Sequence, residues 1–418
     1  MNATAPRADY DLAIVGGGLV GASLALALAP LSLRIAVLEA VEPGTVDQHP
    51  SFDERTTALA NGTVAVFRTL GVWAPMEREA GAIERIHVSE QGRFGTARVR
   101  ADEQGREALG YVLPNRVIGA ALWGGLARVP QVEVIAPAQV TGADLEGDVR
   151  VVRYEQGGEA RELRARLVVA ADGVRSRVRE QAGIEANRID YQQTAIISTA
   201  TTQRFHDHTA YERFTPDGPI AVLPLQDGRV GIVWTRRPED AEQALALDDD
   251  AFLAAFQQAF GLRLGRFLRI GRRYSYPLAL SRTERHVAPR LAVVGNAAQG
   301  LHPISGQGFN LGLRDAVCLA EVLADARVAG ATDVGAPDPL AAYARWREED
   351  QRRIVAFTDG LVRLFASPLG TVRGLRSLGL LAFDAFPPAK AALARLSVGA
   401  AGRVPRLARG VPLAGTSP

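Results

Sequence analysis

The stretch YDLAIVGGGLVGASLALALAPLSLRIAVLE, residues 10–39, decides the fold of this chain. Residues 10–15 read as a buried strand, the glycine run that follows reads as a turn, and the residues up to about Ala29 read as a helix. A second strand at residues 34–38 ends at Glu39, roughly twenty residues after the central glycine. This order of strand, glycine turn, helix, strand and acid is the arrangement that binds dinucleotides.

The glycines and the acid of this stretch each have a predicted task. Gly16 permits the tight turn, Gly18 lets the backbone approach a pyrophosphate, and Gly21 lets the helix pack closely on the strand. The carboxylate of Glu39 would accept hydrogen bonds from ribose hydroxyls. A tight strand-to-helix turn without a ligand is the alternative, and the flanking strands and the position of the acid argue against it.

Residues 12–33 carry no charge and are long enough to span a bilayer, so a membrane helix or a signal peptide is a competing interpretation. Against it, the segment contains four glycines and a proline. Asp9 and Asp11 also precede it, where a signal peptide has basic residues. A buried strand, a glycine turn and a helix account for the same residues.

A second informative stretch is LAVVGNAAQGLHPISGQGFNLGLRDA, residues 291–316. Residues 291–294 fit a buried strand, and the glycine, proline and serine after them predict a sharply bent loop as far as Gly308. Asn310 is predicted to cap the next helix, whose start attracts negative charge through its unpaired N–H groups. Gly306 and Gly308 would let a ligand lie against the backbone. The predicted buried face of the helix consists of Leu311, Leu313, Val317 and Ala320.

The composition describes a globular chain of 418 residues, with 47% hydrophobic and 22% charged residues, long enough for two or three compact units. The net charge of +2 is too small to predict a nucleic-acid partner. Cys318 is the single cysteine, which excludes an internal disulfide, fits a reducing, cytoplasmic compartment and is interpreted as a core thiol. The six histidines lack metal-binding spacing, so no metal site is expected.

The middle of the chain supplies further signals. Residues 53–59 are predicted to open a helix that runs on to about residue 73, and Asn115 is predicted to begin another. Residues 149–154 and 161–166 flank two glycines and read as a hairpin. Residues 167–171 then read as a buried strand that leads into a turn and a helix, with Asp172 as the simplest capping residue.

The last part of the chain changes character twice. From about residue 184 to residue 280 the pattern is one of alternating strands, and beyond Ala341 it is helical. From Gly360 on, eight basic residues accompany a single acid, Asp384, among apolar residues. This tail is predicted either to lie on an anionic membrane surface or to form solvated helices that close the preceding domain, and both interpretations stay open.

The wording GNAAQ followed by HPISGQGFNLGLRD resembles the third flavin-contacting motif of the FAD-dependent aromatic hydroxylases, the family that includes p-hydroxybenzoate hydroxylase. It is most similar to the ubiquinone-biosynthesis branch, above all to the 2-octaprenyl-6-methoxyphenol hydroxylases. Many members carry Asp where this chain has Asn296 and His where it has Gln299. An Asn still hydrogen-bonds a ribityl or ribose hydroxyl. The glycine turn at residues 16–21 and the pair Asp172-Gly173 match the other two flavin motifs.

The resemblance covers nearly the whole chain and implies its architecture. The expected fold is α/β, with a Rossmann-like FAD-binding domain of the p-hydroxybenzoate hydroxylase type, an inserted antiparallel β-sheet substrate domain and C-terminal helices. The expected boundaries are residues 1–75, 111–183 and 281–335 for the FAD-binding domain, 76–110 and 184–280 for the substrate domain, and 336–418 for the helical region.

The resemblance also assigns site residues. Arg55 would reach the FAD pyrophosphate, Asn115 would lie beside the flavin, and Asp172 would lie near the ribose and pyrophosphate. The backbone at the start of the helix would face the N1–C2=O edge of the flavin, where a helix start stabilises negative charge. Pro303 would offer its carbonyl to the substrate hydroxyl, and His302 is a proton-acceptor hypothesis beside a purely structural role. The expected cofactor-binding residues are Gly16, Gly18, Gly21, Glu39, Arg55, Asn115, Asp172, Asn296, Gly306, Gly308, Phe309 and Asn310.

By the same resemblance, reduced FAD reacts with O2 to a C4a-hydroperoxide that delivers a hydroxyl to an electron-rich phenol, with NAD(P)H or another donor supplying electrons. The leading hypothesis is hydroxylation of a polyprenylated phenol in ubiquinone biosynthesis, with peripheral association at the inner face of the membrane and a quinone-biosynthesis complex as possible settings. A soluble flavin hydroxylase of small aromatics or a tailoring pathway is the alternative, and a flavin-holding scaffold subunit without turnover is a third hypothesis. The candidate substrate-pocket residues, which a plain sheet core would also explain, are Phe214, Leu223 and Pro224.

Overall fold

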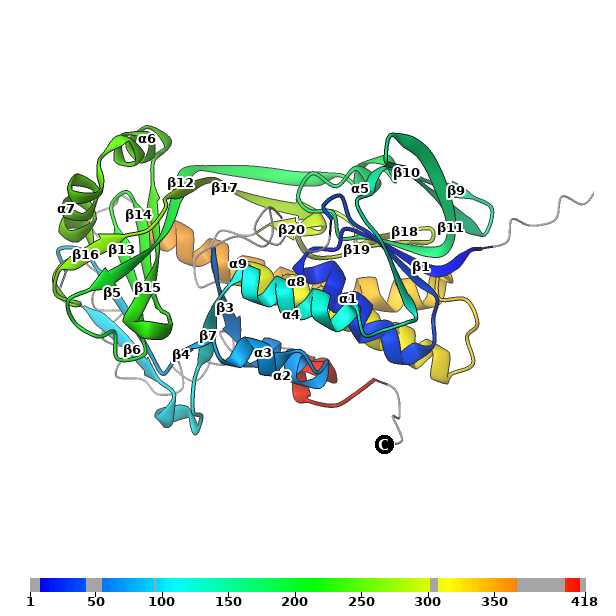
Figure 1. Cartoon of the computed structure of the whole chain (residues 1–418), viewed down its shortest axis with the longest axis horizontal. Helices are drawn as coiled ribbons and strands as arrows, with labels where there is room; N and C mark the ends of the chain where they lie inside the picture. The colour runs from blue at the N-terminus through cyan, green and yellow to red at the C-terminus, as the bar shows by residue number, and fades with distance from the viewer. Residues whose placement is uncertain (1–7, 43–54, 94, 301–306, 367–402, 414–418) are drawn as a thin grey trace, which may run out of the picture.

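Two large sheets lie side by side in the molecule, and a small sheet lies between them (Figure 1). The structure is a computed structural model and describes residues 8–42, 55–93, 95–300, 307–366 and 403–413. The arrangement confirms the predicted α/β fold with a second, largely antiparallel sheet inserted into it.

The first sheet has eight strands and a parallel core in the order β19, β11, β1, β2, β8. Because successive side chains of a strand point to opposite faces, Leu12 and Ile14 enter one core cluster while Ala13 and Val15 enter another. The predicted hairpin is present, and its second arm continues without a break into the predicted buried strand as β11. The strands are β1 (Tyr10–Val15), β2 (Ile35–Leu38), β8 (Val132–Ile135), β9 (Gln139–Glu146), β10 (Val149–Gln156), β11 (Glu159–Ala170), β18 (Val287–Ala288) and β19 (Leu291–Val293).

Helices cover one face of this sheet (Figure 1). Helix α1 (Leu19–Leu28) packs against α4 (Asn115–Leu126) and α8 (Gln307–Val328), and α9 (Pro337–Ala366) packs on α8. The uncharged segment at residues 12–33 is therefore a buried strand and helix, as predicted. In the part of the chain that the structure describes, no helix has the length and apolar character needed to cross a bilayer. The other face is covered by the β9–β10 hairpin and α5 (Arg177–Gln181).

The second sheet has nine strands, and its two longest, β12 and β17, run from one half of the molecule to the other (Figure 1). Its order is β20, β17, β12, β15, β14, β13, β5, β6, with β16 paired to β12. The predicted strand hairpin at residues 220–235 is confirmed. The strands are β5 (Arg85–Glu90), β6 (Thr96–Arg100), β12 (Ala186–Thr202), β13 (Thr209–Thr215), β14 (Gly218–Pro224), β15 (Arg229–Arg236), β16 (Phe267–Ile270), β17 (Tyr274–Thr283) and β20 (Gln299–Gly300).

Two helices in this half were not predicted. Helices α6 (Pro238–Ala246) and α7 (Asp249–Phe260) pack on one face of the nine-stranded sheet. The signals for α7 are in the sequence, because Asp248 caps it and Phe252, Phe256 and Phe260 recur every four residues on its buried face. Trp234 of β15 packs edge-on against Phe252 and Phe256, which fixes the helix to the sheet.

The predicted helix at residues 53–73 is wrong in its first part. After Arg55 the chain forms a strand, β3 (Thr56–Ala60), and only then the helices α2 (Asn61–Thr69) and α3 (Trp73–Glu77). Two β-branched threonines and an antiparallel partner favour the strand, since β3 pairs with β7 (Gly110–Pro114), which also pairs with β4 (Gly81–Ile83). Residues 53 and 54 lie outside the described part of the chain.

The described end of the chain is tied back onto α8. Arg406 donates its backbone N–H to Glu321 at 2.6 Å, and its side chain pairs with Asp325. Arg403 pairs with Glu321 at 3.2 Å and stacks over Trp346. These two basic residues of the predicted tail are thus paired with acids of α8, although Arg403 itself is exposed, and residues 367–402 of that tail lie outside the described part. The short 3-10 turns are η1 (Ala29–Leu31), η3 (Asp102–Gln104), η4 (Gln226–Gly228), η5 (Gly295–Ala297) and η7 (Leu407–Arg409).

Candidate functional site

The glycine turn after β1 packs directly against the turn after β11. A Cβ on Gly16, whose φ is +103°, would lie 2.6 Å from the carbonyl oxygen of Ala171. A Cβ on Gly21 would lie 1.9 Å from the carbonyl oxygen of Gly16. Only glycine therefore allows the first turn of α1 to pack this closely against the glycine turn. Gly18 is the extended N-cap of α1, with φ −61° and ψ −175°. The glycine turn and the Asp172 turn therefore form one surface.

Glu39 lies at the end of β2 beside the glycine turn. One carboxylate oxygen, Oε2, accepts a hydrogen bond from Gly17 N at 2.7 Å, and Oε1 accepts one from Val41 N at 3.1 Å. The side chain is buried. Its predicted position next to the turn is thus the observed one, and whether it holds a ribose stays a prediction.

Asp172 lies against the backbone of Gly16 and does not cap α5. The cap of that helix is Ser176, whose hydroxyl accepts from Arg179 N at 3.1 Å. Oδ1 of Asp172 is sealed from solvent and has no hydrogen-bond partner in the described chain. Burial raises the pKa of this carboxyl, and a hydrogen bond from the Ser176 side chain opposes the shift. A sealed, unpartnered carboxylate oxygen beside a glycine turn fits a ribose hydroxyl donor.

Arg55 and Asn115 are far apart in the sequence, and both are predicted to contact FAD. In the structure they lie side by side. Asn115 N donates to the Arg55 carbonyl at 2.8 Å, and Asn115 Oδ1 accepts from the Thr57 hydroxyl at 2.6 Å. The Arg55 guanidinium lies 4.8 Å from the ring centre of Tyr276 in β17. This pair therefore sits where the small sheet meets the nine-stranded sheet.

Asn310 is not the cap of α8, because the helix already begins at Gln307. Its Oδ1 accepts from Ala60 N at 2.9 Å and from the Thr63 hydroxyl at 2.7 Å, while Nδ2 donates to the Ala58 carbonyl at 2.9 Å. The predicted cap is instead a clamp that fastens the start of α8 to β3 and α2. Residue types alone could not distinguish these roles, since an amide serves both.

The remaining residues of this motif are only partly described. Asn296 is exposed within η5, a Cβ on Gly308 would meet nothing within 4 Å, and the ring of Phe309 lies 6.2 Å from that of Phe67. His302, Pro303 and Gly306 lie outside the described residues.

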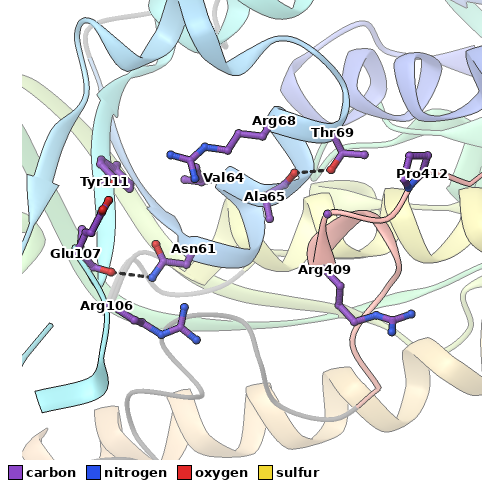
Figure 2. A pocket seen from close by; sticks show the side chains of 12 residues that line it. Asn61, Val64, Ala65, Arg68, Thr69, Arg106, Glu107, Tyr111, Arg409 and Pro412 are labelled. Atoms are coloured by element: carbon purple, nitrogen blue, oxygen red, sulfur yellow. Dashed lines mark hydrogen bonds between the residues drawn. The ribbon is translucent and has the colours of Figure 1, made fainter. Parts of the chain in front are cut away.

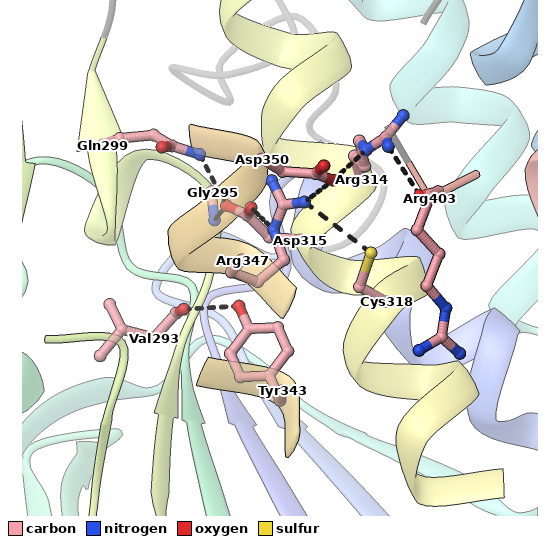
Figure 3. Close-up of polar contacts among 10 residues, drawn as sticks. All are labelled: Val293, Gly295, Gln299, Arg314, Asp315, Cys318, Tyr343, Arg347, Asp350 and Arg403. Carbon is pink, nitrogen blue, oxygen red and sulfur yellow. Dashed lines mark hydrogen bonds and ion pairs between the residues drawn. The ribbon is translucent and has the colours of Figure 1, made fainter. Parts of the chain in front are cut away.

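A buried ionic network behind the motif was not predicted (Figure 3). Asp315 in α8 accepts from Gly295 N and from Gln299 Nε2, each at 3.0 Å, and from Arg347 Nε of α9 at 2.7 Å. Arg347 also pairs with Asp350, which pairs with Arg314. Asp315 thus holds the turn at Gly295 from behind. The sequence marked Asp315 only as part of a motif, and nothing in the run around Arg347 distinguishes a buried arginine from a solvated one.

Comparison with known proteins decides the family. The sequence profile described as "FAD binding domain" matches residues 9–358. Ubiquinone hydroxylase UbiL of Rhodospirillum rubrum is 39% identical over 409 residues, 96% of this chain and 93% of that protein. 3-Demethoxyubiquinol 3-hydroxylase of Escherichia coli is 33% identical over 376 residues, 90% of this chain and 94% of that protein.

The chain belongs to the FAD-dependent aromatic hydroxylases, in their ubiquinone-biosynthesis branch. It is an aromatic-ring monooxygenase that uses FAD and O2, with NAD(P)H or another donor supplying the electrons. The fold agrees with that of p-nitrophenol 4-monooxygenase PnpA from Pseudomonas putida. The two structures superpose with a TM-score of 0.78 at 19% sequence identity, over 95% of this chain and 100% of the PnpA chain. The residues described above fit FAD, because they place a glycine cradle next to Asp172, one carboxylate oxygen of which has no partner in the described chain.

The candidate substrate residues of the hydroxylase do not all share one face of the nine-stranded sheet. Phe214 and Leu223 lie on the face turned away from α7, where Phe214 packs with Val88 and Leu223 with a small cluster that includes Ala210. Pro224 pairs with Val230, whose side chain belongs to the opposite, helix-covered face. The first two therefore share a face, and their contact with a substrate stays a prediction.

Proposed function

We propose that this hydroxylase acts on a polyprenylated phenol, a precursor of ubiquinone. One observation carries the proposal for the tail of the substrate. On the face turned away from α7, Ala221, Val233 and Ile197 are aligned across three strands and are only half-buried. On the helix-covered face, Ile220, Ile232 and Ile196 are 0% exposed. A half-buried row of apolar side chains that faces another part of the protein is suited to line a pocket for an apolar ligand.

The protein's own part in the reaction is to bind, orient and dry the site. Bound FAD supplies the redox chemistry and the activation of O2. Asp172, Glu39 and the glycine turn are proposed to hold its dinucleotide part, and Arg55 its pyrophosphate. The backbone N–H groups of Gly308 and Phe309 are proposed to stabilise charge on the flavin, because they belong to the first turn of α8. Pro303 and His302 remain proposals for contact with the substrate hydroxyl.

The quinone profile of a source strain that lacks this chain tests the function. We expect a prenylated phenol to accumulate and ubiquinone to fall, as measured by mass spectrometry. The wild-type chain should restore the profile and Gly18→Trp should not. The backbone conformation of Gly18 is one that any residue adopts, so the variant should fold, but its side chain would fill the place proposed for the pyrophosphate. An unchanged profile would point instead to a soluble hydroxylase of small aromatics.

We further propose peripheral contact with an anionic membrane. A groove of about 630 Å³ lies between α2, β7 and the chain end at η7 (Figure 2). Arg68, Arg106 and Arg409 line it beside a single acid, Glu107. Arg106 and Arg409 are exposed and have no side-chain partner within the described chain. Cationic side chains held free at one surface attract the anionic leaflet.

Flotation with vesicles tests this contact. The full chain should float with vesicles that contain anionic lipid and stay behind with neutral ones, and the double variant Arg106→Glu/Arg409→Glu should reduce flotation severalfold. Arg128→Glu/Arg188→Glu makes the same change of charge at exposed positions elsewhere and should float like the wild type. Equal loss in both double variants would reduce the effect to net charge and contradict a specific surface.

A further inference from the structure

Glu212 interrupts the apolar row described above. In β13 it lies opposite Ala221 of β14 and beside Val88 of β5. The row then continues through Val233 and Ile197. Its own neighbours in sequence, Tyr211 and Arg213, belong to the other face because side chains alternate along a strand. A carboxyl group thus stands in a wall that is otherwise built to meet an apolar ligand.

The same row faces the FAD-binding half of the molecule. In the next row on one side, Gly231 lies so close to Thr56 of β3 that a Cβ would be 2.8 Å from its hydroxyl. In the next row on the other side, Tyr276 lies under the guanidinium of Arg55. The row of Glu212 runs between the rows of these two contacts, and Glu212 itself lies on β13, two strands away from Gly231 on β15.

The contacts of Glu212 assign it no role in stabilising the fold. No hydrogen bond or ion pair joins its carboxyl to another described residue, although the side chain is only partly accessible. Burial alone raises the pKa of this carboxyl to about 8. An unpaired carboxyl in an apolar environment lowers the stability of the free protein, and such groups are found where a ligand binds to them. Other charged and titratable groups lie on this face and on the elements packed against it, and none of them contributes to the shift in pKa. They are Glu90, Tyr191, Tyr274, Tyr276 and Arg55.

We propose that the Glu212 carboxylate binds the phenolic hydroxyl of the substrate and takes its proton as the ring is hydroxylated. The phenol O–H bond breaks, an O–H bond forms on the carboxylate, and the electron pair stays on the phenol oxygen. No group changes its oxidation state in this step. The phenolate oxygen donates electron density to the ring, which makes the ring carbons better acceptors of an electrophilic oxygen. The proton then leaves to solvent or returns to the product.

The chemistry of the site suits this role. A general base works best when its pKa lies near the working pH, and an ordinary carboxylate is too weak a base for a phenol. The apolar wall around Glu212 strengthens the base by withholding solvent from its charge. The inference deepens the proposed function and rests on it, because it concerns the hydroxyl of the same phenol.

Binding without turnover tests the inference. The purified full chain with oxidised FAD and no electron donor is titrated with a geranylated methoxyphenol and with its O-methyl ether, which cannot donate a hydrogen bond. At about pH 9 the wild type should bind the phenol about tenfold more tightly than the ether, the ratio expected for a hydrogen bond to a charged acceptor. The ratio should fall as the pH drops below the pKa of Glu212.

Three variants make the result specific. Glu212→Gln, whose neutral amide oxygen still accepts a hydrogen bond, should show a smaller preference for the phenol that does not change with pH, and Glu212→Asp should keep a pH-dependent preference. Glu242→Gln, an exposed position on α6 behind the sheet, should behave like the wild type. A preference for the phenol that survives unchanged in Glu212→Gln would overturn the inference.

The pair of guaiacol and its methyl ether separates this inference from the proposed substrate. If the geranylated phenol does not bind but guaiacol shows the Glu212-dependent preference, the polyprenylated substrate is wrong and the role of Glu212 stands. If the geranylated phenol binds and neither pair reports Glu212, the role of Glu212 is wrong and the proposed substrate stands.

Discussion

Arg347 Nε donates to Asp315 Oδ1 at 2.7 Å, and both side chains are 0% exposed. Burial is the largest single effect and would lower the pKa of this guanidinium, but Asp315 acting together with Cys318, Tyr343 and Asp350 outweighs it and raises the pKa. Because the other oxygen of Asp315 accepts hydrogen bonds from Gly295 and Gln299, the pair connects α9 to the turn at Gly295. This turn adjoins Asn296, one of the residues proposed to bind FAD.

The first prediction concerns this pair. Arg347→Met should lower the free energy of unfolding by about 3–5 kcal/mol, because it leaves the Asp315 carboxylate buried without its cation. Urea unfolding of the purified protein measures the loss, and flavin retention during gel filtration should fall with it.

Two further variants separate the pair from a general effect of substitution. Arg347→Met/Asp315→Asn should recover part of the stability, since it removes the second charge as well. Arg352→Met, on an exposed turn of the same helix, should change stability by less than about 1 kcal/mol. A similar loss at Arg347 and Arg352 would contradict the assigned role.

Sequence reasoning found the parts of the site that local patterns determine. The strand, the glycine turn and the acid at Glu39 follow from residues that are neighbours along the chain, and they lie as predicted. The clamp made by Asn310 and the cation behind Asp315 depend on contacts across 250 and 32 positions of the chain. No local pattern carries that information.

The second prediction concerns Asp172. Asp172→Ala should weaken FAD binding about tenfold, because a ribose hydroxyl loses a charged acceptor. The apoprotein should lose no more than about 1 kcal/mol of stability, since the variant removes one carboxylate oxygen without a partner and one hydrogen bond from the Ser176 side chain. Equilibrium dialysis with FAD and thermal unfolding of the apoprotein measure the two effects, with the exposed Asp250→Asn as control. A less stable apoprotein with unchanged FAD affinity would make Asp172 a structural residue.

The third prediction is a pH dependence of stability. The pKa of Glu212 is raised from 4.5 to about 8 on folding, so its stabilising contribution is complete below the lower value and is lost as the pH rises through the higher one. Between roughly pH 5 and pH 9, the wild type should therefore lose on the order of 1–3 kcal/mol more stability than Glu212→Gln. Chemical unfolding of both apoproteins across this range measures it, and parallel curves would show that the carboxyl is not perturbed.

The fourth prediction concerns Cys318. Its thiol is buried on α8 beside Arg347, and burial raises its pKa to about 12. The native protein should therefore resist alkylation by iodoacetamide at neutral pH, and the thiol should react once the chain unfolds. Mass spectrometry of protein quenched at increasing urea concentration follows the reaction. Rapid labelling of the native protein would contradict the packing of α8 against α9.

The errors in the predicted secondary structure have particular causes. The strand β3 was read as helix because five residues are too few to show a period of two, and its partner β7 lies more than fifty positions away. Helix α7 has its own signals, an aspartate cap and phenylalanines four apart, but it lies inside a region whose pattern predicts strands. The face that Glu212 occupies follows only from the register of β13 and β14, which no local pattern gives.

The most direct test of the central claim follows the oxygen atom. The purified chain, loaded with FAD that has been reduced chemically without air, is given a prenylated methoxyphenol and ¹⁸O₂, and the product is examined by mass spectrometry. The account predicts a hydroxylated phenol that carries one heavy oxygen from O2, and a light product when the label is supplied as water. No hydroxylated product, or a product labelled from water, would contradict an aromatic-ring monooxygenase that acts on this class of substrate.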